Sequence, residues 1–269
     1  MLERSVDQMR RLGNKGEEST AAATVGCVFG LMGMFERAAP FADRGILLAE
    51  EIKNPFAEAA AYQQRAIIHD QHGDWSLALA DYQVARAVAE RVGDVFRVFV
   101  LKSWEGRARA MVGDVVAGRA LVEDGLELAA KIGTRLILGW QKTFLAACLL
   151  ASGDHVAATT IGEEAVRAAT ETGDRMPLAL AKRGLADALA RAEGGSHAVA
   201  DTLMREAIQS LEEIGARPEL ARTYLHYGAY LRHAGDGEGA RRHLAKGLAM
   251  FEAMGMTWDG ARARELLGP

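Results

Sequence analysis

The chain has 269 residues, of which 49% are hydrophobic and 6% aromatic, and its formal net charge at pH 7 is −4. This balance excludes the globally basic surface with which nucleic-acid-binding proteins attract phosphates, so we expect no nucleic-acid partner. The longest uninterrupted apolar run, residues 144–151, is far shorter than the roughly 18 residues of a membrane-spanning helix. A charged N-terminus without an apolar stretch behind it argues against a signal peptide. We therefore expect a cytoplasmic protein with no membrane partner.

Glycines recur about every 20 residues from Gly13 to Gly255, and residues that open helices, such as Asp94 and Thr134, commonly follow them. A glycine accepts the left-handed conformation that closes a helix, and the next side-chain oxygen can cap the following helix. The repeat lacks a glycine at Lys53 and gains two residues near Gly195. The pattern predicts short amphipathic helices and no strands. The expected helices span residues 1–12, 16–32, 35–52, 55–72, 75–92, 95–112, 115–132, 135–152, 155–172, 175–193, 196–214, 217–234, 237–254 and 257–267.

Alternate helices resemble each other, so they pair into units of about 40 residues, a period that also suits HEAT and armadillo repeats. Small residues distinguish the families. Each pair carries Gly or Ala at one site on its first helix, again 12 residues later, and again 7 residues beyond that. These sites are Gly26, Ala38 and Gly45; Ala66, Ala78 and Ala85; Gly106, Gly118 and Gly125; Ala146, Ala158 and Ala165; Ala188, Ala200 and Ala207; and Gly228, Ala240 and Gly247.

With these small sites, the chain resembles a tetratricopeptide-repeat (TPR) array over nearly its whole length. The resemblance implies an all-α fold, a right-handed α-solenoid of helical hairpins, forming one superhelix over residues 1–269. The expected units are a half-repeat at 1–12, repeats at 13–53, 54–93, 94–133, 134–173, 174–215 and 216–255, and a terminal capping helix at 256–269.

Two segments, residues 211–224 and 254–264, are similar to the C-terminal TPR regions of bacterial multidomain signalling proteins. In these cyclase, ATPase, LuxR-type or maltose-regulon-activator-like regulators, other domains precede the TPR array. The resemblance implies an interaction or sensory array for signal transduction or transcription regulation. It leaves open whether the chain is a fragment of such a protein. No Gly-x-x-x-x-Gly-Lys loop occurs, so an associated ATPase would lie outside this chain.

In a TPR superhelix the first helix of each pair lines the inner groove, where the residue after the first small site and its neighbours three and four positions away face inward. The surface expected there is mixed, with a basic trend toward the C-terminal half. It suits a protein or peptide segment; a small-molecule effector and self-association through the repeat ends are alternatives. If a ligand binds in this groove, charge removal at Arg107, Lys182 or Arg222 should weaken its binding without lowering the melting temperature, because exposed charges contribute little to stability. The candidate groove residues are Gln63, Asp70, Ser103, Arg107, Trp140, Thr143, Lys182, Arg222 and Arg232.

No constellation typical of catalysis appears, and we predict a non-enzymatic module without a cofactor. His69, Asp70 and His72 could hold a metal on one helical face, which leaves a metal-dependent accessory site as an alternative. The position of these histidines near the C-terminus of a helix, where the helix dipole favours a cation, explains their presence without a metal. The pattern fixes no further ligand, so we predict no metal. Cys27 and Cys148 lie in apolar runs of different repeats and are expected to be free and buried.

Overall fold

The computed structural model describes residues 2–268, in which fourteen α-helices and no strands are found. Met1 and Pro269, at the outer ends of the expected half-repeat and capping helix, lie outside the described residues. No helix in the described part is both long and apolar enough to cross a membrane. The helices are α1 (Leu2–Arg11), α2 (Lys15–Leu31), α3 (Phe35–Glu51), α4 (Pro55–His72), α5 (Trp75–Arg91), α6 (Val95–Met111), α7 (Val115–Lys131), α8 (Leu138–Ala151), α9 (His155–Thr172), α10 (Arg175–Arg191), α11 (His197–Ile214), α12 (Arg217–His233), α13 (Gly237–Ala253) and α14 (Thr257–Leu267).

Most helix joints are closed by a glycine in the left-handed region, as the sequence pattern predicts. Gly73, with a φ of 92°, donates its N–H to the carbonyl oxygen of His69 at 2.9 Å and so ends α4. Where the glycine is missing, Lys53 itself adopts a φ of 51°. Asn54 then caps α4, because its side-chain oxygen accepts the N–H groups of Phe56 and Ala57. The turn conformation is therefore kept even without the residue that favours it.

Two joints differ from the expected pattern. Thr134 does not open a helix: its hydroxyl accepts only the N–H of Leu136, and α8 begins three residues later than expected, at Leu138. At the two-residue insertion Gly194, not Gly195, takes the left-handed conformation, with a φ of 74°. A Cβ on Gly195 would lie 1.8 Å from the carbonyl oxygen of Leu189, so glycine is required there for close approach.

The small sites mark close crossings within each helical pair. A Cβ on Gly106 of α6 would lie 2.5 Å from the carbonyl oxygen of Gly118 of α7. In the α4–α5 pair the corresponding residues Ala66, Ala78 and Ala85 are completely buried. Larger side chains would separate the helices, which explains the spacing of Gly and Ala along the chain.

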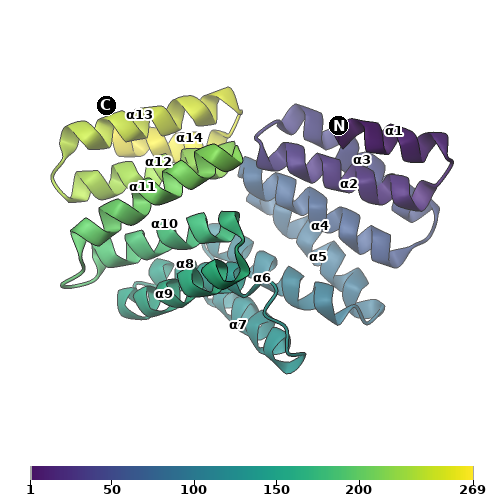
Figure 1. The fold of residues 1–269 in the computed structure, drawn as a ribbon, viewed down its shortest axis with the longest axis horizontal. Helices are drawn as coiled ribbons and strands as arrows, with labels where there is room; N and C mark the ends of the chain where they lie inside the picture. The colour runs from purple at the N-terminus through teal and green to yellow at the C-terminus, as the bar shows by residue number, and fades with distance from the viewer. Residues whose placement is uncertain (1, 269) are drawn as a thin grey trace.

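The first helices of the pairs form an inner layer, in which most successive members pack directly and α4 meets α6 through side chains such as Gln63 and Arg97. We call them the inner helices: α2, α4, α6, α8, α10, α12 and α14. The second helices form the outer layer. The array curves until its two ends lie side by side, with α12–α14 next to the N-terminal helices (Figure 1). Across this closing seam, the rings of Trp75 and Trp258 lie 5.8 Å apart in an edge-on contact, and α12 contacts α4.

Candidate functional site on the inner face

Six charged side chains from five inner helices meet where the array closes. Glu219 of α12 accepts hydrogen bonds from Arg183 at 2.8 Å and from Arg222 at 3.0 Å. Arg107 joins Glu219 at 3.2 Å and also binds Asp70. Arg222 completes the group with a two-pronged contact to Asp259, in which both hydrogen bonds measure about 3 Å. We call the group the inner ion cluster: Asp70, Arg107, Arg183, Glu219, Arg222 and Asp259.

The inner ion cluster is balanced and buried. It contains three arginines and three carboxylates, and the side chain of Glu219 is 0% exposed while that of Arg222 is 5% exposed. Burial by itself raises the pKa of Glu219, but Arg183, Arg222 and Arg107 outweigh it and hold that pKa well below its usual range. For Asp70 burial prevails over Arg107 and Arg222, and the pKa is raised. The cluster is therefore a structural contact whose charges depend on one another.

Arg222 also closes the array through the backbone. Its Nη2 donates to the carbonyl oxygens of Asp70 at 3.0 Å and Gln71 at 3.1 Å, at the C-terminal end of α4. A cation is favoured at this end of a helix because the last carbonyl groups lack helical partners. The guanidinium carbon lies 5.3 Å from the centroid of the Trp75 ring. These contacts fasten α12 to α4 across the seam.

Three of the candidate groove residues, Asp70, Arg107 and Arg222, are thus brought together, but with one another as partners. The expectation that Arg107 and Arg222 are exposed is wrong, because their side chains are only 13% and 5% exposed. The array curves enough for its inner helices to touch, and this buries charges that would face solvent in an open groove. Lys182 is separate, and it pairs with Glu206 of α11 at 2.9 Å.

Four other candidates lie elsewhere on the inner helices and bind neighbouring groups. Gln63 accepts a hydrogen bond from Arg97 at 2.7 Å. Ser103 is completely buried and accepts a hydrogen bond from Gln141. Thr143 donates to the carbonyl oxygen of Gly139, one turn earlier in α8.

The fourth of them is Trp140, whose ring lies 5.4 Å from that of Trp104 and packs into the core cluster around Phe144. Its Nε1 donates to Asp174 at 3.3 Å. Core packing accounts for these contacts of Trp140 without a stacked ligand.

The three residues considered for a metal do not converge. His69 lies 3.7 Å from Asp81, His72 binds Asp74 at 2.7 Å, and Asp70 belongs to the inner ion cluster. Among residues 2–268, no group of three or more His, Cys, Asp and Glu side chains is placed to hold a metal. Cys27 and Cys148 are free and buried, as expected, and burial raises their thiol pKa values to about 12 and about 11.

An open cavity of about 670 Å³ lies beside the inner ion cluster, between α10, α12 and α14. Arg232, the remaining candidate, lines it and donates to the carbonyl oxygen of Leu266 at 2.9 Å. Three arginines and one aspartate give the lining a positive excess. We call this cavity the inner pocket; it is lined by Asp187, Ala190, Arg191, Leu225, His226, Ala229, Tyr230, Arg232, His233, Arg262 and Leu266.

Two arginines of the inner pocket are available to a ligand. Arg191 and Arg262 are exposed, and no ion pair with another described residue engages either of them. The single carboxylate is engaged, since Asp187 contacts His226 Nδ1 at 2.5 Å. Burial raises the pKa of Asp187, but His226 and the nearby arginines outweigh burial and lower it, so this acid remains ionised.

Sequence reasoning missed Arg183, Glu219 and Asp259 of the cluster and Arg191 and Arg262 of the pocket. The basic excess between positions 217 and 246, six Lys or Arg against three acids, did not point to them, because Arg183, Arg191 and Arg262 all lie outside that stretch. Spacing on a single helix does not show which residues meet across the seam.

The helical layers match the fold of solved repeat proteins. A Rap protein complexed with competence and sporulation factor superimposes with a TM-score of 0.76 at 12% identity, covering 96% of this chain and 69% of that one. The apo form of RapI superimposes with a TM-score of 0.69 at 11% identity, covering 96% of this chain and 88% of RapI. The third example is a signal transduction ATPase with numerous domains and a tetratricopeptide repeat sensor, from Pyrococcus horikoshii. It superimposes with a TM-score of 0.61 at 15% identity, covering 99% of this chain and 42% of the ATPase.

The fold is that of a TPR array. At these identities the likeness concerns architecture alone, so the inner face of this TPR array has to be interpreted from its own residues. No protein-family model and no curated protein sequence matches the chain.

Proposed function

We propose that this TPR array is a non-catalytic protein-interaction module that binds an acidic peptide segment in the inner pocket. The observation that carries the proposal is the pair of unengaged arginines, Arg191 and Arg262, at a cavity on the inner face. The solved Rap structure is a complex with a competence and sporulation factor, and the ATPase uses its TPR region as a sensor. These examples support an interaction or sensory array, which we assign to a bacterial signalling or transcription-regulatory protein as part of the proposal.

The lining of the inner pocket suits a carboxylate beside an apolar side chain. A guanidinium presents a planar set of donors that matches a carboxylate in two-pronged geometry. Leu225, Ala229 and Leu266 supply apolar surface between the charged groups. A segment with alternating acidic and apolar residues would satisfy both parts of the lining.

A small anionic effector is the second candidate. The volume of about 670 Å³ lies within the roughly 300–1,000 Å³ of typical small-molecule sites. A thermal-shift screen against carboxylated and phosphorylated metabolites tests this candidate, because a ligand that binds only the folded state raises the melting temperature.

Fluorescence anisotropy with a labelled peptide of alternating glutamate and leucine tests the peptide proposal. We expect the double variant Arg191→Glu/Arg262→Glu to weaken binding at the inner pocket at least tenfold, because both cations become repulsive. Arg167→Glu, a charge reversal at an exposed position of the outer helix α9, is the matched control. The proposal is refuted if the double variant binds the peptide with the same affinity and the same number of sites as the wild-type chain.

A further inference from the structure

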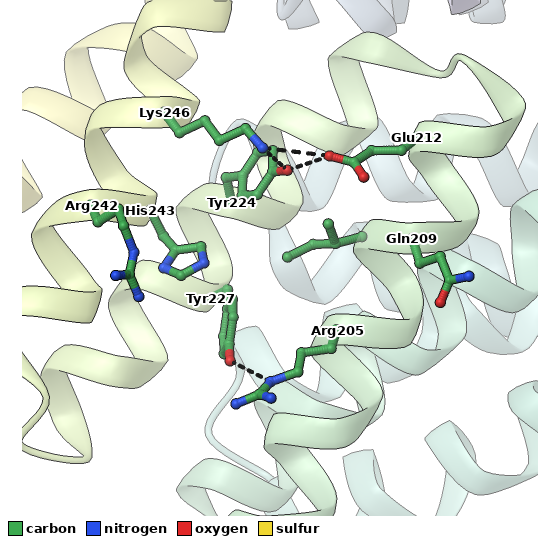
Figure 2. A pocket seen from close by; sticks show the side chains of 9 residues that line it. Arg205, Gln209, Glu212, Tyr224, Tyr227, Arg242, His243 and Lys246 are labelled. Carbon is green, nitrogen blue, oxygen red and sulfur yellow. Dashed lines mark hydrogen bonds and ion pairs between the residues drawn. The ribbon is translucent and has the colours of Figure 1, made fainter.

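A second cleft, of about 600 Å³, opens between the outer helices α11 and α13, with α12 as its floor. Opposite faces of α12 line the two cavities. Tyr224 and Tyr227 line this one, whereas Leu225 and His226 line the inner pocket. We call it the outer cleft. Its lining, drawn in Figure 2, consists of Arg205, Ile208, Gln209, Glu212, Tyr224, Tyr227, Arg242, His243 and Lys246.

The floor of the outer cleft is aromatic. The His243 ring lies 4.6 Å from the Tyr227 ring in an edge-on contact and 6.0 Å from the Tyr224 ring. His243 Nδ1 lies 2.8 Å from the carbonyl oxygen of Gly239, which fixes the ring orientation. Tyr224 and Tyr227 are only 3% and 4% exposed. The half-buried His243 ring, inclined at 61° to Tyr227, is therefore the aromatic surface against which an apolar or aromatic side chain can pack.

Both tyrosine hydroxyls are already engaged within the protein. Tyr227 donates to Asp201 at 2.5 Å and accepts from Arg205 at 3.2 Å. Tyr224 donates to Glu212 at 2.6 Å and accepts from Lys246. The hydroxyls therefore hold the floor in place, and the remaining binding capacity of the cleft lies in its cations.

Those cations outnumber the acids of the lining, with Arg205, Arg242 and Lys246 against Glu212. Figure 2 shows Arg242 and Arg205 on either side of Tyr227, and no dashed line reaches Arg242. Arg242 is exposed, and no ion pair with another described residue engages it. Arg205 already pairs with Asp201 at 2.9 Å and Lys246 pairs with Glu212, so Arg242 is the cation of this lining that is left for an anion.

We infer that the outer cleft is a second docking site, which binds an acidic peptide segment of a partner protein. An aromatic side chain of the segment packs against the half-buried His243 ring, and a flanking carboxylate pairs with Arg242. The exposed Arg205 side chain adds positive charge on the other side of the cleft. Charge complementarity selects this occupant, and a cleft between two neighbouring helices accommodates an elongated segment. The inference does not depend on the inner pocket, which opens on the opposite face of α12.

The test uses a fluorescein-labelled octapeptide of alternating glutamate and phenylalanine, titrated with the full chain at low salt. A peptide with lysine in place of glutamate is the charge control, and it is expected not to bind. Arg242→Glu alone, and Arg205→Glu/Arg242→Glu together, are expected to weaken binding at the outer cleft more than tenfold. Arg241→Glu reverses the charge of an exposed neighbour that does not line the cleft and should leave affinity within about twofold.

Calorimetric stoichiometry separates this site from the inner pocket. If both proposals hold, each chain binds two peptides, and the Arg205/Arg242 and Arg191/Arg262 double variants each lose a different one. Loss of binding only in the Arg205/Arg242 variant supports the outer cleft and refutes the inner pocket. Equal peptide binding by wild type and the Arg205/Arg242 variant overturns the inference. A second outcome also overturns the inference: light scattering finds a wild-type dimer that the Arg205/Arg242 variant does not form, and the wild-type chain does not bind the peptide. The cleft would then join two copies of the chain.

Discussion

Arg222 donates a hydrogen bond of 3.0 Å to the backbone carbonyl oxygen of Asp70, although 152 residues separate the two. The bond joins α12 to the end of α4 and lies within the inner ion cluster. Neighbouring repeats are held together mainly by apolar clusters, whereas buried charges occupy this part of the seam. Closure of the array should therefore respond to single charge changes.

Replacing Arg222 by methionine should lower the free energy of unfolding by about 3–5 kcal/mol, because Glu219 and Asp259 would each lose a partner while remaining buried. Urea denaturation followed by circular dichroism measures the change. Arg167→Met, at an exposed position of α9, should alter stability by no more than about 0.5 kcal/mol. Equal stability of the two variants would mean that the seam is open in solution.

The closeness of the two ends can be tested with a disulfide. A Cβ on Gly73 would lie 3.7 Å from the Cβ of Trp258, close to the ~3.8 Å usual in disulfides. We expect Gly73→Cys/Trp258→Cys to form this bond on mild oxidation. The oxidised form should melt above the reduced form, because the bond restricts the unfolded chain, an effect of about 2–4 kcal/mol.

Any side chain at position 73 is strained, because the backbone there has a φ of 92°. This strain is present in both the oxidised and the reduced form of the variant, so it does not affect the difference between their melting temperatures. The native thiols of Cys27 and Cys148 are buried and should react slowly, so a thiol titration under native conditions reports the new pair. Two titratable thiols that persist after oxidation would contradict the closed arrangement.

Acid should weaken the seam through Glu219. Its pKa is lowered in the folded protein, so its stabilising contribution is complete above the unfolded value of about 4.3 and is lost as the pH falls below it. Asp70, whose pKa is raised, contributes in the opposite direction and offsets part of the loss. We expect Glu219→Gln to be less stable than wild type at pH 7, with the difference narrowing between about pH 5 and pH 3. Denaturant titrations across this range provide the measurement, and a constant difference would count against the ionised Glu219.

The close helix crossings predict a contrast along α5. Ala78 is completely buried, whereas Ala80 on the same helix is exposed. Ala78→Leu should cost about 1–3 kcal/mol or more by overpacking the crossing with α4. Ala158→Leu should behave similarly in α9, where the alanine is also completely buried. Ala80→Leu should be nearly neutral, and thermal melts that fail to separate Ala78→Leu from Ala80→Leu would show that the repeat register is wrong.

The sequence was sufficient to predict the repeat and the close packing within each pair. A joint such as Gly73 depends on the conformation of one residue, and a crossing such as Gly106 with Gly118 joins positions only 12 residues apart. Such short-range requirements leave a regular mark on the sequence. The incorrect prediction at Thr134 is also a local matter. The sequence predicts that Thr134 caps a helix, but the chain makes a further turn before α8 begins.

Only the tertiary structure showed that Asp70, Arg107 and Arg222 face one another instead of an open groove. Their meeting depends on the curvature of the array, which is the sum of small rotations at every repeat junction. No spacing along one helix records that sum, so exposed and buried charges looked alike in the sequence. The same curvature left Arg191 and Arg262 beside an open cavity. Local spacing thus determined the helices and their pairing, and long-range closure decided which of their charges remain available to a partner.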